Sequence, residues 1–283
     1  MSDIYGVLGF PVKHSFSPAM HNAAFKTLNL DAEYRLFEKE SGELREFFAS
    51  AARESIKGFN VTIPYKETAK QFIDVFTEEA MLIGAVNTVK IGARTITGHN
   101  TDGNGFLRHL SEVYRQNLKG LSVSLLGAGG AARAVAYSLS AAGVGRILIF
   151  DALKERAGVL SGEINRAFHA GLTSAAAGIG ELQSCNPELF INATPVGMKE
   201  DDPLLINADK LFPCTFVYDV VYNIPETRLL RTAKARGCNC ANGLGMLLYQ
   251  GVQAFEFWTG RQAPVDVMRR ALEEAVYGKG YGV

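Results

Sequence analysis

Short apolar segments alternate with amphipathic segments along most of the chain, and this alternation is typical of an α/β protein. Apolar runs bounded by turn residues predict strands, and an apolar stripe with helical spacing predicts a helix. The predicted strands are residues 4–8, 32–37, 58–63, 87–91, 95–98, 122–126, 146–150, 189–192 and 216–220, with a hairpin formed by 87–91 and 95–98. The predicted helices are residues 18–28, 42–53, 155–168, 227–236, 245–258 and 265–275, with others from Lys66 onward and between Gly129 and Gly143.

The segment 120–151, GLSVSLLGAGGAARAVAYSLSAAGVGRILIFD, predicts a βαβ unit with a specialised first turn. An apolar strand runs directly into Gly127, and the turn reads G-x-G-x-x-A, the dinucleotide-binding fingerprint with its permitted alanine. Gly127 permits the tight turn, Gly129 lets a pyrophosphate approach the backbone, and Ala132 allows close helix–strand packing. The helix N-terminus would present N–H groups to the phosphates. The alternative is a glycine-rich corner that binds nothing, but the next strand ends on Asp151, the expected acidic residue.

Composition excludes several classes of function. Lys and Arg together number 29, as do Asp and Glu, so neither a nucleic acid nor an acidic membrane is an expected partner. The N-terminus lacks the basic region and apolar core of a signal peptide. No apolar run approaches the ~20 residues that cross a bilayer. We therefore expect a cytoplasmic protein.

The cysteines and histidines predict no metal site. Cys185, Cys214, Cys238 and Cys240 lack zinc-finger spacing, and the last two are too close in sequence for a comfortable disulfide. The histidines show no metal-ligand spacing with the acidic residues. Free thiols in a cytosolic protein are the expected state of the cysteines.

Ser15 and Ser17 lie two residues apart in the run HSFSP, just before a predicted helix. Alternate residues of an extended segment share a face, so both hydroxyls could donate to one carboxylate, helped by the helix N-terminus. However, Ser17 before Pro18 is also an ordinary N-cap. From the spacing alone, capping is the simpler interpretation.

The predicted strand 58–63 carries polar residues on one face only. Asn60 and Thr62 point to the same side, which suggests a lined pocket. Lys66 follows at the junction with the next helix, where functional groups collect in α/β proteins. Taken alone, Lys66 is more simply interpreted as an exposed helical lysine.

Asn87 and the run HNTDGNG at residues 99–105 form another dense polar group flanked by glycines. Such a run is either a surface turn or a site, and a turn is the default interpretation. Asp102 within it could serve as a helix N-cap. The local pattern leaves these alternatives open.

In combination, these motifs resemble those of the shikimate dehydrogenase family. The matching segments, in chain order, are GFPVKHSFSPAMHN, GFNVTIPYK, GAVNT, HNTDGNG, LLGAGGAAR, INATPVGM, YDVVYN and NGLGMLLYQG. The match is collinear, covers nearly the whole chain and includes motifs from both halves of it. Together the segments are far more specific than any one of them.

The resemblance implies reversible reduction of 3-dehydroshikimate to shikimate by a nicotinamide cofactor. Lys66 and Asp102 match the catalytic pair, and Ser15 and Ser17 match the pair that holds the substrate carboxylate. The residues that match positions around the substrate ring are Asn60, Thr62, Asn87, Tyr222 and Gln250. The residues that match cofactor-binding positions are Gly127, Ala128, Gly129, Gly130, Ala131, Ala132, Thr194, Val220, Gly243 and Met246.

The resemblance also implies a two-domain α/β fold. Residues 1–103 and 241–283 would form a discontinuous substrate-binding domain, to which the C-terminal helices return. Residues 104–240 would form a doubly wound, Rossmann-type nucleotide domain. The substrate would sit in the cleft, with the nucleotide domain closing over it. A small-molecule substrate is the expected partner, and both a monomer and a homodimer remain open.

One departure from the family pattern concerns the cofactor. Many members that use NADP carry an Asn-Arg-Thr run after the second nucleotide strand, and its arginine clamps the 2′-phosphate. This chain has Asp151 and Ala152 at the first two of these positions. We therefore expect NAD to be preferred, because the Asp151 carboxylate favours ribose hydroxyls and repels a phosphate. NADP stays usable if Lys154 or Arg156 swings in to meet the phosphate.

The same departure resembles relatives that use NAD and oxidise quinate as well as shikimate. Several of those carry threonine where this chain has Ser17. An NAD-dependent quinate/shikimate dehydrogenase is therefore the alternative within the same class. A non-catalytic nucleotide or shikimate sensor is the alternative from a different class, and the presence of both Lys66 and Asp102 argues against it.

Overall fold

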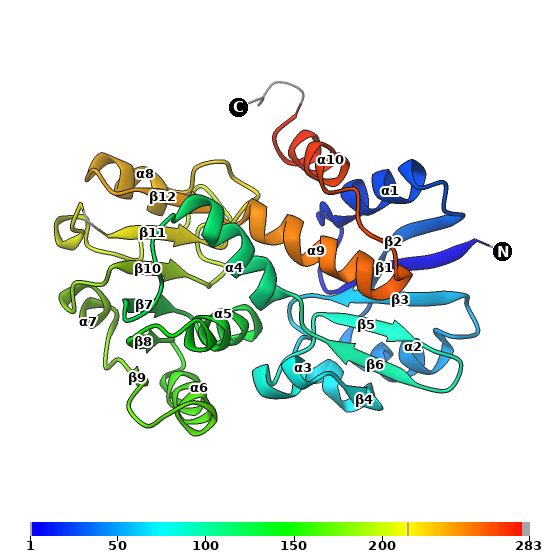
Figure 1. The fold of residues 1–283 in the computed structure, drawn as a ribbon, viewed down its shortest axis with the longest axis horizontal. Helices are drawn as coiled ribbons and strands as arrows, with labels where there is room; N and C mark the ends of the chain where they lie inside the picture. Colours follow the sequence, from blue (N-terminus) through cyan, green and yellow to red (C-terminus); the bar gives the residue numbers. More distant parts are fainter. Residues whose placement is uncertain (1, 214, 279–283) are drawn as a thin grey trace. The chain divides into compact units, whose positions relative to one another are not determined.

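The computed structural model describes residues 2–213 and 215–278, and the chain divides into two compact units (Figure 1). The first unit comprises Met1–Gly105 and Leu247–Val283, and the second comprises Phe106–Met246. The boundaries fall after residues 105 and 246, whereas residues 103 and 240 were expected. The C-terminal helices belong to the first unit, as the predicted fold class requires.

The first unit is built on a mixed six-stranded sheet with the order β2-β1-β3-β5-β6-β4. Its strands are β1 (Asp3–Gly9), β2 (Ala32–Glu38), β3 (Ile56–Val61), β4 (Val75–Phe76), β5 (Thr88–Ile91) and β6 (Ile96–His99). Its helices are α1 (Ser17–Thr27), η1 (Ser41–Glu43), α2 (Leu44–Ser50), η2 (Thr68–Phe72), α3 (Glu78–Ile83) and α10 (Val265–Tyr277). Helix α4 (Asp102–Val113) begins in this unit, and α9 (Leu244–Thr259) ends in it.

Alternation along β1 gives this sheet two buried faces. Leu8 packs against α2 in a cluster that includes Phe47 of α2. Tyr5 points to the other face, where its ring centroid lies 5.2 Å from that of Phe25 in α1 and 5.3 Å from that of Trp258 in α9. The antiparallel pairing of β5 with β6 confirms the predicted hairpin.

The second unit contains a sheet in which every pairing is parallel, with the order β12-β11-β10-β7-β8-β9. Its strands are β7 (Ser122–Leu126), β8 (Arg146–Phe150), β9 (Thr173–Ala175), β10 (Leu189–Asn192), β11 (Phe216–Asp219) and β12 (Cys240–Asn242). Its helices are α5 (Gly130–Ala141), α6 (Lys154–Ala167), α7 (Ile179–Ser184), η3 (Ala208–Lys210) and α8 (Arg228–Ala235), together with most of α4. In chain order, this is the 3-2-1-4-5-6 arrangement of dinucleotide-binding folds.

Separate apolar clusters cover the two faces of this parallel sheet. One cluster joins Val123 and Ile149 to helices α4, α5 and α6, for example through Leu139. The other joins Val217 to α7 and α8, for example through Leu230. Helices on both faces make the unit doubly wound, and the predicted fold class is confirmed.

The sequence pattern was wrong about the helix from Lys66 onward. The chain turns at this point and forms only the 3₁₀ helix η2, because residues from Ile73 onward lead into the short strand β4. Several elements were not predicted, namely β4, α3, α4, β9, α7 and β12. Most of these elements are too short to show a period, and α4 begins inside the polar run 99–105.

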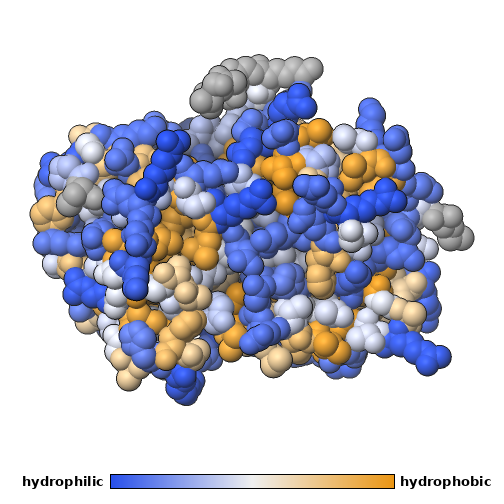
Figure 2. Space-filling view, in the orientation of Figure 1, coloured by the Kyte–Doolittle hydropathy of each residue, from blue (hydrophilic) through white to orange (hydrophobic). Residues whose placement is uncertain are grey.

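The surface carries apolar side chains mainly as scattered residues, and the face drawn in Figure 2 shows them set among hydrophilic neighbours. The large apolar side chains with the greatest exposure include Ile63, Met81 and Leu153, each 60% exposed or more. Within the described residues, no helix is long and apolar enough to cross a membrane.

Candidate functional site

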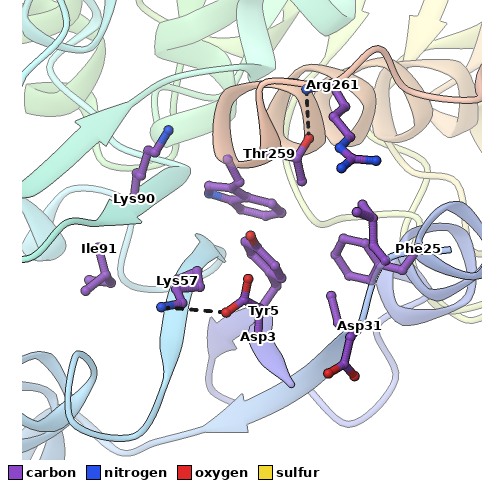
Figure 3. A pocket seen from close by; sticks show the side chains of 12 residues that line it. Asp3, Tyr5, Phe25, Asp31, Lys57, Lys90, Ile91, Thr259 and Arg261 are labelled. Atoms are coloured by element: carbon purple, nitrogen blue, oxygen red, sulfur yellow. Dashed lines mark hydrogen bonds and ion pairs between the residues drawn. The ribbon is translucent and has the colours of Figure 1, made fainter. Parts of the chain in front are cut away.

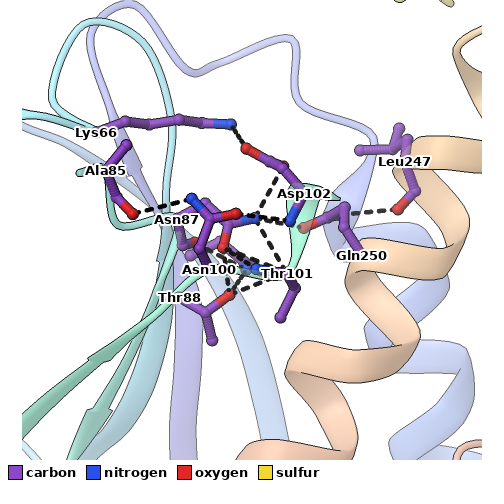
Figure 4. A network of polar contacts seen from close by, with 10 residues as sticks. Lys66, Ala85, Asn87, Thr88, Asn100, Thr101, Asp102, Leu247 and Gln250 are labelled. Carbon is purple, nitrogen blue, oxygen red and sulfur yellow. Dashed lines mark hydrogen bonds and ion pairs between the residues drawn. The ribbon is translucent and has the colours of Figure 1, made fainter. Parts of the chain in front are cut away.

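The core of the candidate site is a contact between Lys66 and Asp102 in the first unit (Figure 4). Lys66 lies in the turn after β3, and Asp102 is the first residue of α4. Their side chains are 16% and 6% exposed, and the lysine Nζ donates to Oδ2 of the carboxylate. A nearly buried ion pair of this kind is held in one geometry, unlike a surface pair.

Asn87 fixes the other side of the Asp102 carboxylate. Its Nδ2 donates to Asp102 Oδ1 at 2.8 Å and to Thr101 Oγ1 at 3.0 Å. Its Oδ1 accepts from the Thr101 backbone N–H at 2.8 Å and from Thr88 Oγ1 at 3.0 Å. Gln250 of α9 completes the group, with Oε1 3.4 Å from Asn87 Nδ2 (Figure 4). The structure therefore brings Lys66, Asn87, Asp102 and Gln250 together.

Asn60 is also part of this polar cluster, but its amide faces inward. Both of its Nδ2 contacts are internal, to the carbonyl oxygen of Asn87 at 3.1 Å and to Thr88 Oγ1 at 3.1 Å. Its Oδ1 accepts from the hydroxyl of Tyr34 at 2.7 Å. The amide hydrogens of Asn60 are thus committed within the protein, and only Oδ1 retains capacity for a further bond.

Ser17 does not cap helix α1 in the way that the simpler interpretation predicts. Helix α1 begins at Ser17, and no side chain caps it by the usual bond to the N2 or N3 amide. Instead, Ser15 Oγ accepts a 3.3 Å hydrogen bond from the Ser17 N–H. The Ser17 hydroxyl is buried and hydrogen-bonds to Tyr34, whose own pKa burial raises well above its usual value. Capping therefore does not explain the side chain of Ser17.

Thr62 follows β3 directly and is only half-buried. Its Cγ2 would lie 2.5 Å from a Cβ on Gly9, so the methyl group packs against the end of β1. Its hydroxyl has no hydrogen-bond partner among the described residues and is available to a ligand.

The glycine turn of the second unit has the features of a phosphate site. Gly127 adopts the left-handed region (φ +108°), and a Cβ there would lie 2.9 Å from the carbonyl oxygen of Ala193. Gly129, in contrast, has open space in front of its Cα. The N–H groups of residues 130–132 find no acceptor in the part of the chain that the structure describes. The start of α5 is therefore a ready site for an anion.

Asp151 lies beside this turn, directly after β8. Its Oδ2 accepts from the Ala128 N–H at 2.8 Å, and its Oδ1 accepts from the Leu153 N–H at 2.8 Å. The carboxylate is therefore fixed across the glycine turn. Ala152 and Arg156 are exposed, and Arg156 forms no ion pair within the described residues.

The remaining predicted cofactor residues follow β10, β11 and β12. Thr194 is held by Asn192, whose Oδ1 accepts from Thr194 Oγ1 at 2.7 Å. Val220 and Gly243 lie in contact, since a Cβ on Gly243 would fall 2.0 Å from the Val220 carbonyl oxygen. Met246 is buried in the apolar cluster of the second unit. Tyr222 is partly exposed just after β11.

Sequence reasoning missed several buried polar residues of these clusters. Tyr34, Asn192 and Asp219 were not singled out, although Asn192 and Asp219 stand in the quoted segments INATPVGM and YDVVYN. Asp219 is fully buried and accepts from Asn192 Nδ2 at 2.9 Å. A polar residue at the end of an apolar strand was the available signal. For Tyr34, which lies in the edge strand β2, the sequence contains no such signal.

A hollow of about 370 Å³ in the first unit does not coincide with the polar cluster (Figure 3). Its lining includes Asp3, Tyr5, Lys57 and Trp258, near the start of β1 and the end of α9. None of the predicted site residues lines it. The described residues contain no group of His, Cys, Asp and Glu that could hold a metal ion, and Cys214 lies outside them.

Comparisons with known proteins agree with this arrangement. A shikimate dehydrogenase substrate binding domain matches residues 7–89, and a shikimate 5′-dehydrogenase C-terminal domain matches residues 243–273. The chain is 44% identical over 279 residues to a shikimate dehydrogenase (NADP(+)) of Methanopyrus kandleri, with 96% of each chain covered.

Solved structures are similar over the same length. A shikimate dehydrogenase in complex with NADP+ has a TM-score of 0.90 and 38% identity, covering 97% of this chain and 96% of that one. A shikimate 5-dehydrogenase from Listeria monocytogenes, in complex with shikimate and NAD, has a TM-score of 0.86 and 37% identity, with 96% of each chain covered. A quinate dehydrogenase from Corynebacterium glutamicum, in complex with NAD, has a TM-score of 0.86 and 34% identity, covering 95% of this chain and 98% of that one.

The parallel sheet with its glycine turn, joined in one chain to a lysine–carboxylate pair, defines a dinucleotide-dependent oxidoreductase. Its curated relatives and solved neighbours match it almost end to end. The chain belongs to the shikimate dehydrogenase family.

Proposed function

We propose that this protein catalyses the reversible reduction of 3-dehydroshikimate to shikimate at the polar cluster of the first unit. The observation that carries the proposal is the contact of Lys66 with Asp102, within a chain matched by a shikimate dehydrogenase substrate binding domain. The second unit supplies a turn suited to a dinucleotide.

Lys66 is the group that moves the proton. Oxidation of a secondary alcohol needs a base for the hydroxyl proton, and reduction of the ketone needs an acid to return it. Lys66 Nζ can perform both tasks from one position, because Asp102 holds it there. Asp102 keeps lone pairs for a substrate hydroxyl, and Asn87 fixes the plane of its carboxylate.

The remaining contacts hold the substrate in place. In the proposal, the Ser15 and Ser17 hydroxyls donate to the substrate carboxylate, and the Ser17 hydrogen turns from Tyr34 to do so. Thr62 and Gln250 bind ring hydroxyls. The hydroxyl of Thr62 supports this role, because it is partly exposed and has no hydrogen-bond partner among the described residues.

The residues of the second unit fit a dinucleotide. The open approach to Gly129 and the unpaired N–H groups at the start of α5 suit its phosphates. When bound, the dinucleotide supplies the nicotinamide that carries the hydride. In the proposal, Thr194, Val220, Gly243 and Met246 border the nicotinamide, while Asp151 faces the adenosine ribose.

NAD is the proposed preferred cofactor, and the support for this is local. The Asp151 carboxylate is fixed beside the glycine turn and retains lone pairs for ribose hydroxyls. A 2′-phosphate would bring about two negative charges against it. Ala152 offers no compensating cation. The curated relatives named for NADP(+) do not favour this preference, so it rests on Asp151 and Ala152 alone.

A four-way steady-state assay tests the function and the cofactor together. Shikimate and quinate are each oxidised with NAD+ and with NADP+, and kcat/KM is compared. We expect shikimate with NAD+ to give the highest value. If none of the four pairs is turned over, the proposed enzymatic function is wrong and a non-catalytic sensor is favoured. Faster turnover of quinate would identify quinate as the substrate in place of shikimate. The relatives named for shikimate do not favour that outcome.

A cytoplasmic location is part of the proposal. Its support is the chemistry of the cysteines, because Cys185, Cys238 and Cys240 form no disulfide in the described part of the chain.

A further inference from the structure

Asp219 is a buried carboxylate that the proposed chemistry does not use. It is the last residue of β11 and has no exposed surface. Its Oδ1 accepts from Asn192 Nδ2 at 2.9 Å and from the Val221 N–H at 3.1 Å. Its Oδ2 accepts from Thr227 Oγ1 at 2.6 Å. Among the residues that the structure describes, no cation pairs with it, and burial raises its pKa to about 6.

Through Asn192, Asp219 is connected to the loop after β10. Asn192 Nδ2 also donates to the carbonyl oxygen of Val196 at 3.0 Å, and Asn192 Oδ1 accepts from the Thr194 N–H at 3.1 Å. The same loop contains Gly197 in the left-handed region, where a Cβ would lie 3.8 Å from Asp219 Oδ2. Loop 193–197 is therefore connected to Asp219 through the side chain of Asn192.

Asp219 is also connected to the segments that follow β11. Its bond to the Val221 N–H fixes the turn that contains Val220 and Tyr222. Thr227, which donates to it, is the N-cap of α8 and accepts from the Leu230 N–H. One carboxylate thus joins loop 193–197, turn 220–222 and the start of α8.

The sheet order assigns these loops to one half of a bound dinucleotide. The order reverses between β7 and β10, and ligands bind outside the carboxyl ends of strands at such a point. Asp151 follows β8, on the side where the adenosine half binds. β10 and β11 lie on the other side, so their loops belong to the nicotinamide half.

We propose that Asp219 is a positioning residue that holds loop 193–197 and turn 220–222 in the geometry needed for hydride transfer. It acts through backbone groups and Asn192, without touching the reacting atoms. The inference rests on the proposed function. A displacement of about 1 Å at a reacting centre can cost on the order of a hundredfold in rate.

Asp219→Asn is the informative variant, because it keeps the volume but replaces one acceptor with an amide donor. If the amide oxygen faces Asn192 and Val221, its NH₂ group meets the Thr227 hydroxyl that donated to Asp219 Oδ2. Thr227→Val is the second variant, since it removes that donor and keeps the carboxylate. Thr215→Val is the matched control, because it removes a buried bond to the Pro187 carbonyl just before β11, away from the loops.

Five quantities are measured on the full-length protein. They are kcat and KM for shikimate, dinucleotide affinity by titration calorimetry, amide exchange at Val221, and the unfolding midpoint. We expect Asp219→Asn to lower kcat by about 10- to 100-fold, with KM for shikimate within about threefold of wild type. Exchange at Val221 should accelerate, because a neutral amide oxygen accepts the Val221 N–H more weakly than a carboxylate does. Thr215→Val should leave kcat within about twofold, and Thr227→Val should follow Asp219→Asn in direction.

The outcomes separate the inference from the proposed function. Wild type that fails to turn over shikimate would remove the proposed function, while dinucleotide affinity and exchange at Val221 would still test the role of Asp219. Faster exchange at Val221 with unchanged kcat and affinity would overturn the inference. An equal loss of kcat in Thr215→Val would also overturn it, because the effect would then be one of general stability. If Asp219→Asn does not fold, Thr227→Val decides between the same outcomes.

Discussion

Nδ2 of Asn87 donates a 2.8 Å hydrogen bond to Oδ1 of Asp102, the carboxylate oxygen that Lys66 does not contact. The two oxygens of Asp102 therefore have different partners, and each partner is a donor. An amide at position 102 could satisfy only one of them. Asparagine at position 102 therefore cannot replace the carboxylate and still accept from both Asn87 and Lys66.

The first prediction concerns this pair. Lys66→Ala should lower kcat by about 10²–10⁴, the usual scale of positioned acid–base catalysis, with a smaller change in KM. Asp102→Asn should also lower kcat, because Asn87 would hold the amide oxygen and turn the NH₂ group toward the ammonium of Lys66. Steady-state kinetics measure both effects. Near-native turnover by Lys66→Ala would show that the assignment is wrong.

The second prediction concerns the serine pair. A hydrogen bond to a charged group contributes about 1.5–3 kcal/mol, so Ser17→Ala should raise KM for shikimate roughly tenfold or more. Ser17 makes no usual N-cap bond but does hydrogen-bond to Tyr34, so its loss should lower the unfolding free energy by the ~1 kcal/mol of one buried hydrogen bond. Ser15→Ala should raise KM similarly. Chemical denaturation supplies the control, and a loss of stability with unchanged KM would leave only a structural role.

The third prediction concerns cofactor choice. With Asp151 fixed beside the glycine turn, kcat/KM for NAD should exceed that for NADP by at least about tenfold, or roughly 1.4 kcal/mol. The double variant Asp151→Asn, Ala152→Arg should shift the ratio toward NADP, since it removes the repulsion and adds a guanidinium. Initial rates with each cofactor at saturating shikimate give the ratio. Wild type that prefers NADP would refute this interpretation of Asp151 and leave the enzyme assignment standing.

The fourth prediction concerns pH and the buried His21. Its ring has no exposed surface, stacks on Tyr34 at a centroid distance of 4.3 Å, and has no hydrogen-bond partner for either nitrogen within the described residues. Burial lowers its pKa to about 3. In the unfolded chain, the His21 ring binds a proton as the pH falls through about 6.5, whereas in the folded protein the ring stays neutral there. The stability contributed by neutral His21 is therefore complete above pH 6.5 and is lost as pH falls toward 3.

The unfolding free energy should accordingly fall by up to about 1.4 kcal/mol for each pH unit below 6.5 on account of this residue. His21→Phe keeps an aromatic ring against Tyr34 and should flatten the slope. Equilibrium denaturation at pH 5, 6 and 7 measures it. Burial raises the pKa of Asp219 in the folded protein, so its effect on stability has the opposite sign. The unfolding free energy that Asp219 contributes is lost as pH rises from about 4 to 6. An unchanged slope in His21→Phe would show that another group controls acid unfolding.

The strands of the second unit were the easiest part of the fold to predict. Strands buried on both faces are continuous apolar runs, and the predicted bounds 122–126 and 146–150 are those of β7 and β8. Short elements such as α3 (Glu78–Ile83) span fewer than two helical turns, so no period could reveal them. The polar segment after β3 was mistaken for a helix because its continuation into β4 depends on pairing with β6.

The candidate site was less accessible to local reasoning. Lys66 and Asp102 each had a simpler local interpretation, and only the resemblance across the whole chain singled them out. The buried residues that form hydrogen bonds within these clusters were harder still to predict. Tyr34 bonds to Asn60, 26 positions away, and Asn192 bonds to Asp219, 27 positions away. Such pairs form only when the strands are in register, so no spacing in the sequence predicts them.

The return of the last helices to the first unit means that this unit can complete its contacts only late in synthesis. The first sheet is bound by residues near the end of the chain, since Trp258 Nε1 donates to the Val89 carbonyl at 2.9 Å and Gln250 meets Asn87. All strands of the parallel sheet, by contrast, have been translated by residue 242. On the ribosome, the middle of the chain therefore has its full set of strands first. The N-terminal segments complete their contacts only after α9 and α10 have been translated, although they emerged earliest.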